Sequence, residues 1–134
     1  MNLQIRTSSV LRGVGAGLAC LAPGVRGRAT AVLASYGAAW AVDPVGIQFF
    51  AIAPDESADP FVRAATPFVT SAASWTGVQL LAASTIRRQG VPAPLAAVAY
   101  GALVAVADSA AADAFVRLRA KRAATSAEAA PAAE

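Results

Sequence analysis

Histidine is absent from this chain of 134 residues, and cysteine occurs once, as Cys20. Without histidine, the chain lacks the most common general base and metal ligand of proteins. A single cysteine cannot form an intramolecular disulfide or complete a zinc site of the Cys/His type. No stretch matches a catalytic or nucleotide-binding motif, so the sequence predicts no metal, no cofactor and no catalytic residue. We therefore expect the protein not to be an enzyme.

Charge is also scarce, because 14% of the residues are charged and 57% are hydrophobic. An average soluble domain carries about 25% charged residues, and a small one needs polar residues to cover its large relative surface. The formal charge is +3, but the basic residues stand at the ends of apolar segments, where they favour a membrane interface. The composition thus predicts a partner in the lipid bilayer and none in nucleic acid.

Three apolar segments are long enough to cross a bilayer: residues 29–53, 64–86 and 91–116. The clearest is 64–86, which contains no formal charge and lies between Arg63 and the pair Arg87 and Arg88. As a helix it would extend roughly 35 Å, enough for a hydrocarbon core of about 30 Å. These segments predict membrane-spanning helices.

Residues 8–25 form a fourth, weaker apolar segment that contains Arg12 and Pro23. As a helix it would reach about 27 Å, so it would cross the bilayer only with the Arg12 side chain extended to the interface. It could instead lie along the membrane surface as an amphipathic helix, or be a cleaved signal. A lipoprotein signal ending at Cys20 is disfavoured by Gly17, where such signals carry a bulky aliphatic residue.

The predicted fold is all-α: an integral membrane helical bundle of three to four spans with short loops. Residues 1–122 form a single membrane-embedded helical domain, with basic turns at 25–28 and 87–90 and an acidic loop at 54–60. Residues 123–134 contain alanine, serine, threonine, glutamate and proline without large apolar side chains, which predicts a disordered tail. The predicted location is the cell membrane, with several crossings.

The orientation depends on the number of spans. With four alternating spans, the side that holds both termini carries seven basic residues and the other side four. Positive charge favours the cytoplasmic side, so this count predicts cytoplasmic termini. With three spans the count is five against six, and the preference weakly reverses.

Two helical strips of small or hydroxyl-bearing residues predict close helix packing. One strip comprises Thr66, Thr70, Ser74, Gly77 and Leu81, and the other Ala97, Gly101, Ala105, Asp108 and Ala112. We expect these two faces to pack against each other. The hydroxyl groups either bond to carbonyls of their own helix or line a polar path, and the first interpretation is favoured.

Asp43 interrupts an apolar run immediately before Pro44. A residue before proline disfavours the helical region, and Asp-Pro is a typical helix start. We therefore predict a break at Val42 and Asp43, followed by a short helix over 44–53. The rival interpretation is a continuous helix kinked at Pro44, which would bring Asp43 close to Asp108 so that the two carboxylates share a proton.

The candidate polar residues inside the membrane are Asp43, Gln79 and Asp108, because polar groups in lipid often have functional roles. We expect a small polytopic membrane protein of non-enzymatic, structural or accessory type. It would pack through its small-residue helix faces against a second copy or a larger membrane protein. The alternative is a small oligomeric transporter or channel, coupled to protons or cations, that uses these three residues.

Overall fold

The computed structural model describes residues 4–43 and 51–130. These residues form four α-helices and no strand: α1 (Thr7–Leu21), α2 (Gly24–Val42), α3 (Pro60–Arg88) and α4 (Ala93–Ala129). The predicted all-α class is confirmed. Each helix contains most of one of the four apolar segments identified in the sequence.

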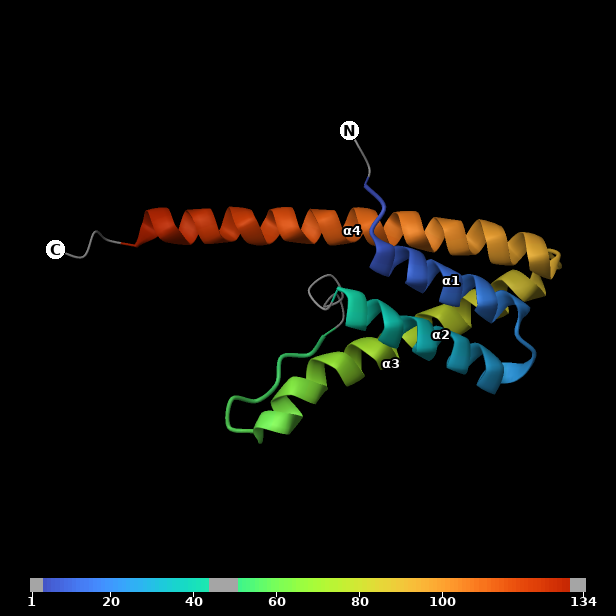
Figure 1. The fold of residues 1–134 in the computed structure, drawn as a ribbon, viewed down its shortest axis with the longest axis horizontal. Coiled ribbons are helices and arrows are strands. Elements are labelled where there is room, and N and C mark those ends of the chain that lie inside the picture. The colour runs from blue at the N-terminus through green and yellow to red at the C-terminus, as the bar shows by residue number, and fades with distance from the viewer. Residues whose placement is uncertain (1–3, 44–50, 131–134) are drawn as a thin grey trace.

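Helix α1 is the centre of the bundle and contacts each of the other three helices. It runs alongside the first half of α4, while α2 lies on its other side and α3 packs against α2 (Figure 1). Successive helices run in opposite directions, so the end of α1 lies near the start of α4 (Figure 1). The second half of α4 extends beyond the bundle.

The turn between α1 and α2 is shorter than the sequence predicted. Ala22 and Pro23 alone separate α1 from α2, and Arg26 and Arg28 lie in the first turns of α2 rather than in a basic turn. Gly90, with φ of +73°, provides the turn after α3, since this backbone region favours glycine.

The start of α3 has the Asp-Pro arrangement that is typical of a helix start. Asp59 is the N-cap, its carboxylate accepts a hydrogen bond from the Phe61 backbone N–H at 2.8 Å, and Pro60 opens the helix.

Replacing Asp59 with alanine is expected to lower the free energy of unfolding by about 1 kcal/mol, because a helix N–H loses its acceptor. Chemical denaturation in detergent checks this value. The control is Asp59→Ser, which retains an acceptor oxygen; an equal loss in both variants would contradict the capping role.

Asp43 ends α2 rather than continuing it. The residue is not helical, with φ of −147°, and its N–H donates a hydrogen bond to the Ala39 carbonyl at 3.0 Å. The predicted break is confirmed, and the rival prediction of a continuous helix is wrong, because proline disfavours helical backbone in the residue before it. Of the short helix predicted at 44–53, residues 44–50 lie outside the described residues, and 51–53 are not helical.

The acidic loop before α3 is exposed at Asp55 and Glu56. Hydrogen bonds from the Ser57 backbone N–H and hydroxyl lower the pKa of Asp55 below its ordinary value. This carboxylate therefore stays ionised at neutral pH, and the loop keeps its negative charge.

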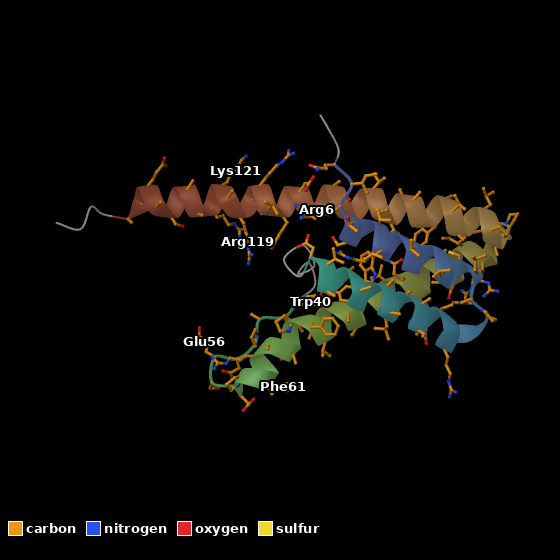
Figure 2. All side chains as sticks on the ribbon, in the orientation of Figure 1. Arg6, Trp40, Glu56, Phe61, Arg119 and Lys121 are labelled. Atoms are coloured by element: carbon orange, nitrogen blue, oxygen red, sulfur yellow. The ribbon has the colours of Figure 1, made fainter. Side chains whose placement is uncertain are left out.

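The carboxyl end of α4 differs from the prediction of a disordered tail from Ala123. The helix continues to Ala129, and every residue from 116 to 130 is exposed. Alanine has the highest helix propensity of the residues, so this segment is helical without packing against the bundle. Arg119 and Lys121 lie on this projecting part, away from the other helices (Figure 2). Residues 131–134 of the predicted tail lie outside the described residues.

The distribution of side chains is the reverse of that in a water-soluble domain. Among the described residues, no leucine, isoleucine or phenylalanine is buried. The largest fully buried side chains are those of Arg12, Tyr36, Val32 and Cys20, followed by serines, whereas Phe61, Val98 and Leu81 are more than 70% exposed. Soluble proteins bury their large aliphatic side chains. The interior of this bundle instead consists mainly of small residues together with several polar ones, and many large aliphatic side chains lie on its surface.

One helix in the described part of the chain, α4, is long and apolar enough to cross a membrane by length and composition. The core helix of a soluble protein can meet the same criteria. The predicted three to four spans are therefore not established. Helix α1 has only 15 residues, about 22 Å at 1.5 Å per residue, and α3 carries several hydroxyl groups and Gln79.

Candidate functional site

A buried ion pair lies at the junction of the four helices. Arg12 of α1 is 1% exposed and its Nη1 donates to the carboxylate of Asp108 on α4, which is 6% exposed. Ser9, one turn before Arg12, donates its hydroxyl hydrogen to the other oxygen of Asp108 at 2.6 Å. The guanidinium carbon of Arg12 lies 6.0 Å from the ring centroid of Tyr36 on α2 and 5.9 Å from that of Trp75 on α3. Side chains from all the other helices thus surround the guanidinium of Arg12 on α1.

A second ionic group lies nearer the end of the bundle. Arg6, just before α1, donates from Nη1 to Asp43 at 3.2 Å and from Nε to Asp113 at 3.0 Å. Its backbone N–H also donates to the hydroxyl of Ser109 on α4, at 3.1 Å. The three charged side chains are about 29% exposed. Arg6 therefore links the end of α2 to α4 at the edge of the buried pair.

Two neutral hydrogen bonds complete the polar interior. Gln79 of α3 is 2% exposed and its Oε1 accepts from the Tyr100 hydroxyl of α4 at 2.7 Å. On the α2 side, the Tyr36 hydroxyl donates to Ser71 Oγ on α3 at 2.5 Å. The first bond connects α3 to α4, which share little other contact, and the second adds to the packing of α2 against α3.

The Gln79–Tyr100 bond provides a direct test of this packing. Tyr100→Phe removes one hydroxyl and leaves the buried Gln79 oxygen without that donor, so we expect a loss of about 1 kcal/mol in the free energy of unfolding. Denaturation in detergent measures it. Tyr100→Phe in a Gln79→Leu background should cost much less, and equal losses in both backgrounds would contradict the bond.

The three candidate residues therefore occupy three different sites. Asp108 is in the buried pair, Asp43 pairs with Arg6, and Gln79 bonds to Tyr100. Asp43 and Asp108 each have an arginine as ionic partner, so the sharing of a proton between them is not needed to explain their positions.

The close contact of α1 and α4 depends on glycine. A Cβ atom built on Gly13 would lie 2.5 Å from the Gly101 carbonyl oxygen, and one on Gly17 would lie 2.7 Å from the Ala97 oxygen. Real Cβ atoms do not approach backbone oxygens so closely. The two helix backbones are therefore nearer than any side chain would permit, as in membrane helix pairs with small residues at the interface.

The predicted pairing of the two small-residue strips is wrong. The α4 strip faces α1 through Gly101 and Ala105, whereas on the α3 strip a Cβ built on Gly77 meets nothing within 4 Å. The hydroxyls of Thr66, Thr70 and Ser74 donate to carbonyls of their own helix at 2.6–2.8 Å. The favoured interpretation of these hydroxyls is confirmed. The contact of α4 with α1 was not predicted, because the glycines of α1 lie in residues 8–25, the weakest of the four apolar segments.

Sequence reasoning missed Arg12 and Arg6 as site residues, because arginine near the end of an apolar segment was expected to extend to the interface. A signal was present in the chain. Arg6, just before α1, is six residues from Arg12 on that helix, and Asp108 and Asp113 are five apart on α4. In an antiparallel pair, this spacing on α1 and α4 brings opposite charges together in two layers.

Comparison with family models, with curated proteins and with solved structures finds no match to this chain.

The site is chemically a charge-compensated polar core. Groups of three or more metal-ligating side chains do not occur among the described residues. The carboxylate of Asp108 accepts hydrogen bonds from a guanidinium and a hydroxyl, and hydrogen bonds to a charged group are stronger than those between neutral groups. Such an arrangement fixes helix positions, and a route for ions would need these bonds to be exchanged.

Proposed function

We propose that this protein is a small polytopic integral membrane protein of structural or accessory type, without catalytic activity. The observation that carries the proposal is the inverted side-chain distribution, with Arg12 and serines inside and large aliphatic side chains outside. In water, the exposed apolar surface would favour aggregation. In a bilayer, the same surface is solvated by lipid, and the buried charges face the bundle interior, as is usual for membrane proteins.

We propose that the protein packs against a partner through the outer face of α3. Ala73, Ser74, Gly77 and Leu81 are all exposed there, and Gly77 has open space above its Cα. Small residues permit a second helix to approach closely. The α4 strip is already used against α1, so of the two predicted strips the one on α3 remains available. A second copy of the chain is the partner that can be tested directly.

The test is energy transfer between donor- and acceptor-labelled copies of the full chain in liposomes. We expect transfer that persists on dilution with lipid and that falls sharply in Gly77→Leu. The control Ala110→Leu enlarges an exposed residue of α4 and should leave transfer unchanged. Transfer that declines with dilution as for freely mixed monomers would contradict self-association.

The second candidate function is a proton- or cation-coupled transporter. The observation that favours it is the presence of two ionic groups in the bundle, Arg6 with Asp43 near its end and Arg12 with Asp108 in its interior. Reconstituted protein should then carry proton or cation flux that Asp43→Asn and Asp108→Asn reduce. The structural proposal predicts no flux above that of empty liposomes. Flux that is present with the unmutated chain and lost in both variants would contradict it and support the transporter instead.

A further inference from the structure

We propose that the outer groove between α1 and α4 binds an acyl chain of an anionic phospholipid, whose headgroup lies against four arginines at the end of the bundle. The groove has a volume of about 350 Å³, and each residue that lines it is glycine, alanine, valine or leucine. The proposal rests on the proposed membrane location of the chain, but not on packing through the outer face of α3.

The shape of the groove fits one extended hydrocarbon chain. Gly13, Gly17 and Gly101 line it where the two helix backbones are closest. Its α1 side is formed by four half-exposed aliphatic residues: Val10, Val14, Leu18 and Leu21. These eleven steps along α1 measure about 17 Å at 1.5 Å per residue, close to one leaflet, which is half of a hydrocarbon core of about 30 Å.

The groove begins at an end of the bundle where the charged side chains are all arginines. This arginine end comprises Arg26 and Arg28 in the first turns of α2 and Arg87 and Arg88 in the last turn of α3. None of the four pairs with a carboxylate in the described part of the chain. Apart from Asp108, the described acidic residues lie at the end of α2, in the loop before α3 and in the second half of α4, all toward the opposite end (Figure 1). The arginine end therefore complements an anionic group.

The arginine end adjoins the groove. Arg28 lies beside Leu21, because its Nε donates to the carbonyl of Ala22 at 3.3 Å. The two arginines of α3 follow Ile86, which packs against the same buried cluster as Ala97 of the groove. Guanidinium groups recognise phosphate, and basic pockets between membrane helices bind anionic headgroups. A phospholipid has this arrangement of an anionic head on an apolar chain, so one molecule satisfies both surfaces.

The experiment titrates the full chain in neutral detergent with dipalmitoylphosphatidylglycerol and, separately, with the corresponding phosphatidylcholine, and measures bound lipid by native mass spectrometry. We expect tighter binding of the anionic lipid. Its affinity should fall about thirtyfold in the double variant Arg28→Gln with Arg87→Gln, which corresponds to about 2 kcal/mol, or about 1 kcal/mol for each arginine removed. Circular dichroism verifies that each variant is folded.

The matched control for charge is Arg117→Gln with Arg122→Gln, which removes two arginines from the exposed part of α4 and should leave the affinity unchanged. For the groove, Ala102→Phe fills part of the space and should weaken binding about tenfold. Ala110→Phe enlarges an exposed residue of α4 outside the groove and should not.

An equal loss in both arginine double variants would overturn the proposal, since general electrostatic attraction would explain it. Unchanged binding by folded Ala102→Phe would also overturn it, as would a dimer that Ala102→Phe dissociates, because a second copy would then occupy the groove. Equal binding of the two lipids would overturn this proposal and leave the membrane location intact, whereas binding of neither lipid would contradict both.

Discussion

Asp108→Ala is expected to lower the free energy of unfolding by about 3–5 kcal/mol, the loss typical when one member of a buried ion pair is removed. The reason is that Arg12, 1% exposed at the junction of the helices, would keep its charge without the carboxylate that compensates it. Ser9 would lose its acceptor in the same variant. Reversible denaturation of the purified chain in mixed micelles measures the loss.

The double variant Arg12→Leu with Asp108→Leu distinguishes lost compensation from lost packing. Replacing both charges by apolar groups is often neutral or stabilising, so the double variant should recover most of the stability. Asp113→Ala is the matched acidic control, because its carboxylate is 29% exposed on the same helix, and its loss should be about 0–1 kcal/mol. A double variant less stable than both single variants would contradict the proposed role of the pair.

Gly13→Leu is the second substitution with a large expected effect, because it must separate α1 from α4. Even a Cβ atom at this position would lie 2.9 Å from the Ala105 side chain and 2.5 Å from a backbone oxygen. Overpacking typically costs 1–3 kcal/mol, occasionally more, and separation of the helices would also lengthen the Arg12–Asp108 contact. We therefore expect a loss of at least about 3 kcal/mol or failure to fold.

The series Gly13→Ala, Gly17→Ala and Gly37→Ala provides a graded measurement of the same contact. A Cβ at Gly37 meets nothing within 4 Å, so Gly37→Ala should be neutral or stabilise by up to about 1 kcal/mol through helix propensity. The other two should destabilise, since their nearest neighbours are backbone atoms that cannot rotate away. Equal effects at the three positions would contradict the close helix contact.

Much of the fold was accessible from the sequence because local signals placed its helix boundaries. The proline after Asp43 marked the end of α2. Helix α4 continues to Ala129 because alanine favours a helix, and the prediction of a disordered tail did not take this propensity into account. Boundaries depend on a few neighbouring residues, so sequence reasoning reaches them.

The site was less accessible because it depends on which helices are neighbours. Asp108 was identified as a candidate, but its partner Arg12 lies 96 residues earlier and was assigned to the membrane interface. The pairing of α1 with α4 follows from Gly13, Gly17 and Gly101 together. Composition and spacing on one helix could not reveal it, since the same glycines are also compatible with a surface helix.

The central claim is that the bundle crosses a membrane with Arg12 and Asp108 enclosed. Labelling of single cysteines in membrane vesicles, with Cys20 removed, tests it at Ser57, Gln89 and Ser126. Ser57 lies in the loop before α3 and Ser126 near the end of α4, both toward the end of the bundle that carries Arg6. Gln89 lies in the turn between α3 and α4, at the other end (Figure 1). We predict that an impermeant thiol reagent labels Gln89→Cys from one side and Ser57→Cys and Ser126→Cys from the other. Labelling of all three from one side would contradict the account.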